Sequence, residues 1–306
     1  MKKIKYCLVV FLFVWTFIHI NNAYAQQYVF RILANKGSNL MKISSDNSDW
    51  QLVKTGMQLK KEDELMLGEN AYIGLVHNSG KTIELKNPGA YKIADLINKI
   101  TNTSTSMASK YADFVFAQML QQDEIEFNKN PSSYTKSTGS VERSTAQIEI
   151  VGPASVNVFN PVTTIKWMPV ENADLYTITV KNIFENIILT KKTSETELTL
   201  DLNDAALRNE KLLIVSVSTK KDKIISDNIG VKKLTNQEYA SINKQLNILE
   251  SEMKEETAMD KIIEAAFFEE NNLLLDAITQ YELAIKMAPD VDDFKILYRK
   301  FLTKYQ

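Results

Sequence analysis

The stretch AYIGLVHNSGKTIEL, residues 71–85, decides the fold of the first part of this 306-residue chain. Two apolar runs flank the turn residues Asn78 to Gly80, an arrangement typical of a β-hairpin. Short runs of alternating apolar and polar residues, separated by turn residues, continue on both sides from residue 28 to residue 92. The sequence therefore predicts a small all-β domain over residues 26–92.

The hairpin is part of a longer pattern in which a tryptophan, several leucines and glycines and an acidic turn follow one another. The residues that carry it are Trp50, Leu52, Gly56, Leu59, Asp63, Leu65, Gly68, Ala71, Leu75, Ser79, Gly80, Ile83 and Leu85. Residues 46–92 thus resemble the FecR-like extracytoplasmic domain, although Glu62 stands where that family commonly has glycine. The resemblance implies a rigid periplasmic platform for protein interactions and not an enzyme. It also implies a core position for Trp50, whose alternative role is stacking on a sugar ring.

The N-terminal residues have the features of an export signal. Three lysines precede an apolar run from Cys7 to Ile20, and Ala23-Tyr24-Ala25 then offers small residues to a signal peptidase. We predict that residues 1–25 are a signal peptide and that the mature protein begins at Gln26. The protein is then exported, to the periplasm in the first place, with secretion or the cell surface as the alternative. A retained membrane anchor is the weaker interpretation because a spanning helix needs about 20 apolar residues, so no integral span is expected after cleavage.

Charge and cysteine content exclude several classes of function. The chain has 36 Lys and Arg residues and 38 Asp and Glu residues, with both signs spread along it. A weakly acidic chain without a basic block gives no reason to expect nucleic acid or an anionic membrane surface as a partner. The one cysteine, Cys7, lies in the predicted signal, so the mature protein is expected to have no disulfide and no thiolate site.

Residues 93–127 are predicted to form a helical connector. Apolar residues with helical spacing are Ile93, Leu96, Ile97 and Ile100, and then Met107, Tyr111, Phe114, Val115 and Met119. Two helices or one interrupted helix satisfy this pattern, and we expect the apolar stripe to pack on its own domain. Residues 128–147 are rich in Asn, Ser, Thr and Lys and predict a flexible linker.

A second β domain is predicted over residues 148–234, where short apolar runs recur with the rhythm of a β-sandwich. Characteristic positions are taken by Pro161, Ile165, Trp167, Val170, Ala173, Tyr176, Ile178 and Val180. With these residues the segment resembles fibronectin type III and related immunoglobulin-like domains. The resemblance implies that Trp167 is the core tryptophan.

Residues 235–306 are predicted to be helical. Thr235 and Glu238 have the spacing of a capping box, which begins a helix. Apolar residues three and four apart then form a stripe, which consists of Tyr239, Ile242, Leu246, Leu249 and Met253. This stripe is our candidate protein-binding surface. Packing against neighbouring helices is its alternative role, and dimerisation is a minor one.

From residue 265 the helical pattern becomes more specific. Small, aromatic and proline residues alternate as Ala265, Phe268, Ala277, Tyr281, Ala284 and Pro289. This resembles one tetratricopeptide unit, although Lys261 replaces its usual bulky first residue and at least three repeats normally form a free-standing superhelix. The resemblance implies a small helical hairpin that binds a protein segment.

Catalytic, cofactor and metal sites are not predicted. His77 and Ser79 lie too close together on a hairpin to adopt the orientation of a triad, and no phosphate-binding, dinucleotide or zinc-protease motif occurs. Acidic clusters at residues 62–64 and 290–293 have oxygen ligands for calcium as an alternative to roles in a turn and at a helix start.

The sequence thus predicts a multidomain protein, mainly β with α. Its expected function is that of an exported, non-catalytic scaffold or adaptor that contacts an unknown envelope protein. The alternative is a binder of glycan or peptidoglycan that uses the β domains. A hydrolase with convergent carboxylates is the third hypothesis.

Overall fold

The structure is a computed structural model that describes residues 28–43, 49–100, 107–120, 147–219, 224–253 and 256–305. The predicted signal peptide and nearly all of the predicted linker lie outside these residues. Helices and strands each take up about a third of the described chain, which therefore combines β-sheets with helices, as predicted. Within the described ranges no helix is both long enough and apolar enough to span a bilayer.

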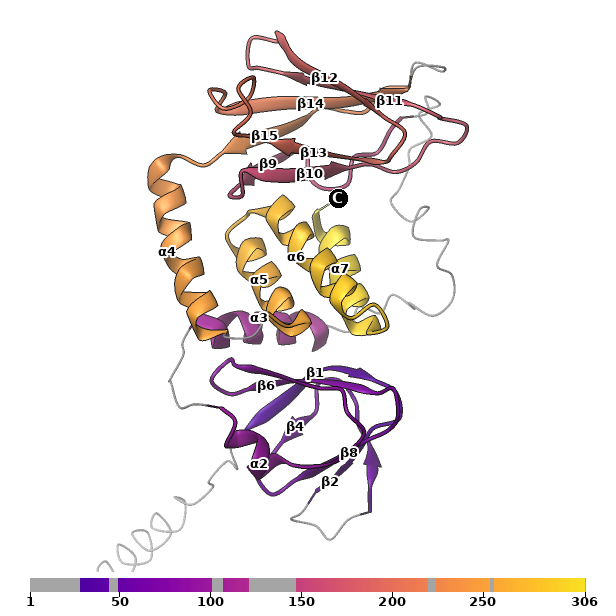
Figure 1. The fold of residues 1–306 in the computed structure, drawn as a ribbon, viewed down its shortest axis with the longest axis vertical. Coiled ribbons are helices and arrows are strands. Elements are labelled where there is room, and N and C mark those ends of the chain that lie inside the picture. Colours follow the sequence, from indigo (N-terminus) through magenta and orange to yellow (C-terminus); the bar gives the residue numbers. More distant parts are fainter. Residues whose placement is uncertain are drawn as a thin grey trace, which may run out of the picture.

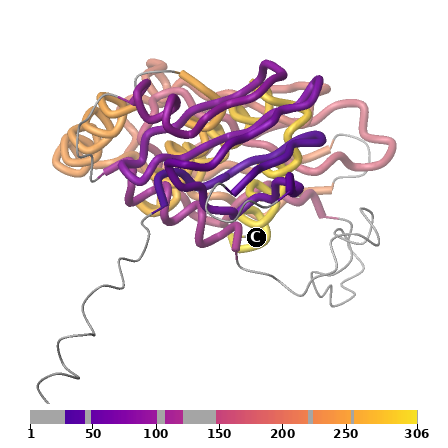
Figure 2. Tube along the Cα trace, turned by 90° about the horizontal axis from the view of Figure 1, so that it is seen from below, coloured from indigo at the N-terminus to yellow at the C-terminus, as the bar shows by residue number. Residues whose placement is uncertain are grey.

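Two β modules lie at opposite ends of the molecule, and a layer of helices lies between them (Figure 1). This helical layer consists of α3 (Met107–Leu120), α5 (Ala258–Glu270), α6 (Leu274–Met287) and α7 (Asp292–Tyr305). On one side, α5 contacts β7 (Thr82–Leu85) and α7 contacts β1 (Phe30–Lys36) of the first module. On the other side, α6 contacts β9 (Ser155–Val158) and β10 (Val162–Lys166) of the second module. The view from below shows the first module lying across the helices (Figure 2). The C-terminal helices are therefore central in space.

The first β module contains two antiparallel sheets, each of four strands. One has the order β4 (Gln58–Leu59), β1 (Phe30–Lys36), β6 (Tyr72–His77) and β7 (Thr82–Leu85). The other has the order β3 (Gln51–Leu52), β2 (Leu40–Lys42), β5 (Glu64–Leu67) and β8 (Gly89–Lys92). The predicted hairpin is confirmed, because β6 pairs with β7 from Ile73↔Leu85 to Val76↔Thr82. Buried side chains such as Phe30 and Leu75 form a core separate from that of the rest of the protein.

The second β module also has two sheets. The larger has the order β12 (Ile187–Thr193), β11 (Tyr176–Lys181), β14 (Leu212–Thr219), β15 (Ile229–Lys233) and β9 (Ser155–Val158). The smaller pairs β10 (Val162–Lys166) with β13 (Glu197–Asp201). Trp167 is 2% exposed and meets Tyr176 edge to face, with ring centroids 5.4 Å apart. The predicted core position of Trp167 is confirmed.

The predicted capping box is present at the start of α4 (Asn236–Glu252). The Glu238 backbone N–H donates to Thr235 Oγ1 at 3.3 Å, and the Thr235 backbone N–H donates to Glu238 Oε2 at 2.8 Å. Both orphan amides at this helix start are therefore satisfied. Helix α4 leads from the second module toward α3, along the side of the helical layer (Figure 1).

The predicted connector divides between two parts of the fold. Helix α2 (Ile93–Ile97) packs on β8 of the first module, whereas α3 packs on α4 and α5. Tyr111 of α3 is buried against Phe267 of α5, with ring centroids 5.3 Å apart. The apolar stripe of α3 is thus covered within the chain, but by the C-terminal helices. The helical hairpin of α5 and α6 holds a segment of its own protein.

Candidate functional site

Two glycines of the β6–β7 hairpin allow the helical layer to approach the first module. A Cβ atom at Gly74 would lie 3.2 Å from Met259 Cγ of α5. Gly80 has a φ of +88°, and a Cβ atom there would lie 2.7 Å from Ser109 Cα of α3 and closer still to the neighbouring backbone. A residue with a side chain cannot occupy position 80 without moving the helix. The hairpin therefore serves as a seat for two helices.

Arg31 of β1 fastens α3 to the first module. Its buried guanidinium group forms an ion pair with Asp113 and lies over the ring of Phe116, 4.4 Å from the centroid. Arginine suits this position because it stays charged and stacks on an aromatic face. This contact holds α3 against the first module. We call the contact region between the helical layer and the first module the joint.

Carboxylates in the first turns of two helices complete the joint. Asp260 of α5 accepts a hydrogen bond from the Thr82 hydroxyl group. Asp293 of α7 accepts from the Asn35 backbone N–H at 2.8 Å and from Thr55 Oγ1 at 3.2 Å. Burial raises the pKa of both carboxyl groups above the usual value for aspartate. Each helix start is therefore bonded directly to a strand or loop of the first module.

A third carboxylate joins the helical layer to the second module. Asp276 of α6 is buried and accepts from the backbone N–H groups of Phe159 and Asn160 at 2.9 and 3.0 Å. The Asn160 side-chain amide donates to the same carboxylate at 2.7 Å. Both β modules are thus hydrogen-bonded to one set of helices. We call the two β modules and the helical layer together the frame.

The predicted binding stripe on α4 is used largely within the protein. Leu246 and Leu249 are buried, and the Tyr239 ring stacks on Phe159 with centroids 4.8 Å apart. Ile242 and Met253 are half-buried. Of the five predicted residues, Tyr239 offers the largest exposed fraction, 44%. The packing that we considered as the alternative role accounts for the buried members.

Trp50 lies outside the core, contrary to the position that the family pattern implied. It precedes β3, a strand of two residues at the edge of its sheet, and 37% of its surface is exposed. Leu52, another residue of the pattern, is more exposed still. A short edge strand has no neighbour to cover these side chains. The Trp50 side chain is therefore partly open to solvent.

The histidine and the acidic clusters have local roles. His77 Nδ1 lies 2.8 Å from Ser79 Oγ and accepts from the Ser79 backbone N–H at 3.1 Å, so this nitrogen holds the turn. Burial lowers the pKa of His77. Asp63 accepts from the Lys60 backbone N–H, and Asp290 forms an ion pair with Lys36. In the part of the chain that the structure describes, no group of three or more potential metal ligands converges.

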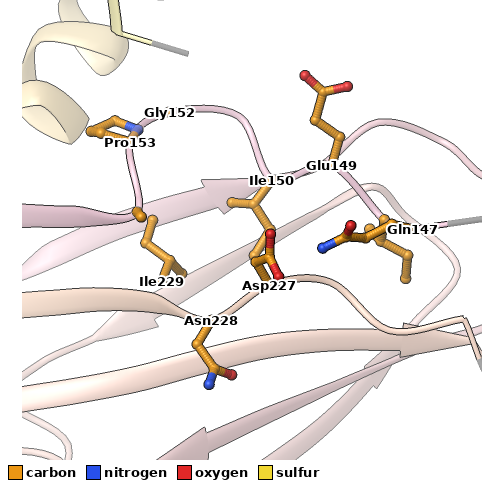
Figure 3. A pocket seen from close by; sticks show the side chains of 10 residues that line it. Gln147, Glu149, Ile150, Gly152, Pro153, Asp227, Asn228 and Ile229 are labelled. Atoms are coloured by element: carbon orange, nitrogen blue, oxygen red, sulfur yellow. The ribbon is translucent and has the colours of Figure 1, made fainter. Parts of the chain in front are cut away.

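Among the hollows that described residues line, three contain charged side chains. The first, of about 370 Å³, lies beside β15 and contains the carboxylates of Glu149 and Asp227. Figure 3 shows Glu149 directed away from Asp227. The second lies between the second module and α4 and includes Arg208 and Tyr239. The third lies at the joint beside Asp260. The acid pair that a hydrolase requires is not formed by Glu149 and Asp227.

Three of the five most exposed large apolar side chains among the described residues lie in the turn between β11 and β12 or at the start of β12. Phe184 is 74% exposed, Ile187 63% and Ile183 57%. We call these three residues the apolar tip. The sequence predicted no binding surface here, although it has two apolar residues, Ile183 and Phe184, between the polar Asn182 and Glu185.

Hydrogen bonds within the turn hold the apolar tip in place. Asn182 is buried, and its side-chain oxygen accepts from the backbone N–H groups of Phe184 at 3.0 Å and of Asn186 at 3.1 Å. Glu185 takes a positive φ of 62° inside this ring of bonds. A turn closed in this way has few alternative backbone conformations, so the backbone that carries Phe184 is held in place.

Comparison with known proteins assigns no family to this arrangement: no protein-family model matches the chain, and no curated protein matches it either.

Proposed function

We propose that the protein is an exported, non-catalytic scaffold or adaptor that binds another protein of the cell envelope. The apolar tip carries this proposal. Three large apolar side chains close together in an exposed turn cost solubility, and such patches usually mark an interaction site. Because Asn182 holds the turn, the backbone of the apolar tip would lose little conformational freedom when a partner binds. Phe184 would act as the anchor that enters a pocket of the partner.

The finer fold assignments belong to the same proposal. We propose that the first module is FecR-like, that the second is a fibronectin type III-like sandwich, and that α5 and α6 form a tetratricopeptide-like pair. The sheet order β12-β11-β14-β15-β9 facing β10-β13 supports the sandwich assignment. Pro289, two residues after the end of α6, supports the helical assignment. Modules of these kinds serve mainly in protein interaction, which agrees with the function proposed here.

The frame also favours a scaffold. Arg31, Asp260 and Asp276 connect the helical layer to both β modules, so a partner held at the apolar tip keeps a fixed orientation toward the first module. The first module offers a second exposed surface around Trp50 and Leu52. A protein with two such surfaces at opposite ends can bring two partners together.

A photoreactive amino acid placed at position 184 in living cells tests the proposal. We expect it to crosslink one recurrent envelope protein. The same group at Val162, which is exposed on the other sheet of the module, serves as the matched control. Phe184→Ser and Val162→Ser should each leave the free energy of unfolding within about 0.5 kcal/mol of the wild-type value because both residues are exposed. Equal capture from both positions, or none from position 184, would contradict the proposal.

Glycan binding is the second candidate, and the partial exposure of the Trp50 side chain favours it. An aromatic face outside the core can stack on a sugar ring. Cosedimentation of residues 26–306 with purified cell-wall material tests this function. Loss of pelleting in Trp50→Ala, with retention in Phe184→Ser, would favour glycan binding over the adaptor function. Retention of pelleting in Trp50→Ala, with loss in Phe184→Ser, would contradict glycan binding through Trp50.

A further inference from the structure

Strand β12 ends the larger sheet of the second module on one side. It pairs with β11 from Ile187↔Lys181 to Thr193↔Tyr176, with a β-bulge at Ile188, and no other described strand pairs with it. Its outer edge consequently offers the backbone N–H and C=O groups of alternate residues, in a regular row from Leu189 to Thr193 beyond the bulge. Such an edge is a template for one more strand, and proteins recognise extended peptides in this way.

The edge is apolar at one end and positively charged at the other. Ile187 begins the strand next to the apolar tip, whereas Lys191 and Lys192 near its end are exposed. Neither lysine has an ion pair among the described residues. The nearest acidic residues in sequence, Glu185 and Glu195, lie in the turns that flank the strand. A strand rises by about 3.3 Å per residue, so the exposed edge passes from apolar to cationic within about 20 Å.

These charges indicate which kind of strand fits. Lysines on an edge strand oppose the pairing of two copies, because their like charges come together at the shared edge. An incoming strand with carboxylates would instead gain from the same lysines, and its charge would also speed the encounter. A second copy of this protein is therefore the less suitable occupant, and an acidic segment is the more suitable one.

We propose that β12 binds an extended segment of a partner protein as a sixth strand of this sheet, with apolar residues of that segment next to Ile187 and Phe184 and acidic residues next to Lys191 and Lys192. This inference rests on the proposed adaptor function, since it names the partner chemistry at the same site. Main-chain hydrogen bonds supply affinity, and the apolar-to-cationic gradient sets the direction and register of the added strand.

Binding of labelled peptides to residues 26–306, followed by fluorescence anisotropy, tests the inference. The probe is a nine-residue peptide with valine and phenylalanine in one half and consecutive glutamates in the other, because Lys191 and Lys192 lie on opposite faces of the strand. It is used in both chain directions because the added strand can be parallel or antiparallel. We expect one direction to bind. Lys191→Glu combined with Lys192→Glu should weaken binding about tenfold at low salt, and much less at high salt. Lys232→Glu, an exposed lysine on β15 of the same sheet, is the matched control and should change little.

A second version of the peptide, N-methylated at alternate residues, cannot form the ladder of hydrogen bonds along one edge and should not bind. Equal binding of the methylated peptide would overturn strand addition. Equal binding by the double lysine variant would overturn the acidic partner, and a concentration-dependent dimer that the peptide dissociates would assign the edge to a second copy. If position 184 captures a protein in cells while the double lysine variant captures it equally well, the adaptor function stands and this inference fails.

Discussion

Replacement of Gly80 by alanine should separate α3 from the first module. Gly80 has a φ of +88°, so an alanine there costs about 1–2 kcal/mol in backbone strain alone. Its Cβ atom would also overlap backbone atoms of Ala108 and Ser109, which cannot turn aside as a side chain can. Overpacking of this kind costs about 1–3 kcal/mol more. The free energy of unfolding should therefore fall by about 2–5 kcal/mol.

Gly56→Ala is the matched control for this substitution. Gly56 has a similar φ of +92°, but a Cβ atom there would meet only Leu120 Cδ2, at 3.1 Å. The Leu120 side chain is exposed and free to move. The control should therefore show the strain without the overlap.

Urea unfolding gives the difference between the two variants, and hydrogen exchange locates it. Amides of α3 should exchange faster in Gly80→Ala than in Gly56→Ala, because α3 has to move to admit the methyl group. Free energies of unfolding within about 0.5 kcal/mol of each other, with equal protection of α3, would refute the close approach of hairpin and helix.

Three other substitutions test the cores and the joint. Trp167→Ala should cost about 3–5 kcal/mol through lost transfer energy and a cavity, and an unchanged melting temperature would refute the core position. Glu269→Ala should cost about 2–3 kcal/mol, since its buried carboxylate accepts from the Tyr281 hydroxyl and from Lys304, and urea midpoints would measure this. Burial raises the pKa of Asp293, so the folded state favours the protonated form; its stabilisation relative to Asp293→Asn should grow as pH falls from neutral toward the ordinary value of 3.8 and level off below it. Urea midpoints for wild type and Asp293→Asn that differ by the same amount at pH 7 and pH 4 would contradict this pKa shift.

Local patterns determined the parts of the fold that depend on neighbouring residues. The β6–β7 hairpin follows from apolar runs around Asn78 to Gly80, and the start of α4 follows from the spacing of Thr235 and Glu238. Trp167 was expected in the core from the resemblance of residues 148–234 to fibronectin type III domains, whose characteristic positions alternate as in a sandwich. In each case the deciding interaction joins residues that are close in the chain or repeat with the period of a strand.

Positions that depend on an edge or a turn were harder to predict. Trp50 belongs to a regular pattern, but it precedes β3, which has only two residues and is the edge strand of its sheet. Its side chain is therefore less buried than the pattern predicts. Phe184 lies in a turn between two well-predicted strands, and exposure of a phenylalanine there has no periodic signal. Candidate binding residues were therefore sought on the apolar stripe of α4, whereas the most exposed large apolar side chain of the described residues, Phe184, lies on the β11–β12 turn.

The sequence by itself determined that the chain combines β-sheets with helices, the β6–β7 hairpin and the capping box of α4, and the resemblance to fibronectin type III domains indicated the core position of Trp167. Only the tertiary structure decided that the last helices lie between the two β modules and that α3 belongs with them. The contacts responsible join residues far apart in the chain: 82 positions separate Arg31 from Asp113, 178 separate Thr82 from Asp260, and 258 separate Asn35 from Asp293. The periodicity of a segment states that it has an apolar face, but not which distant face will cover it. Gly80 shows the difference, since the same glycine that the turn requires locally is also where a helix from elsewhere in the fold comes to rest.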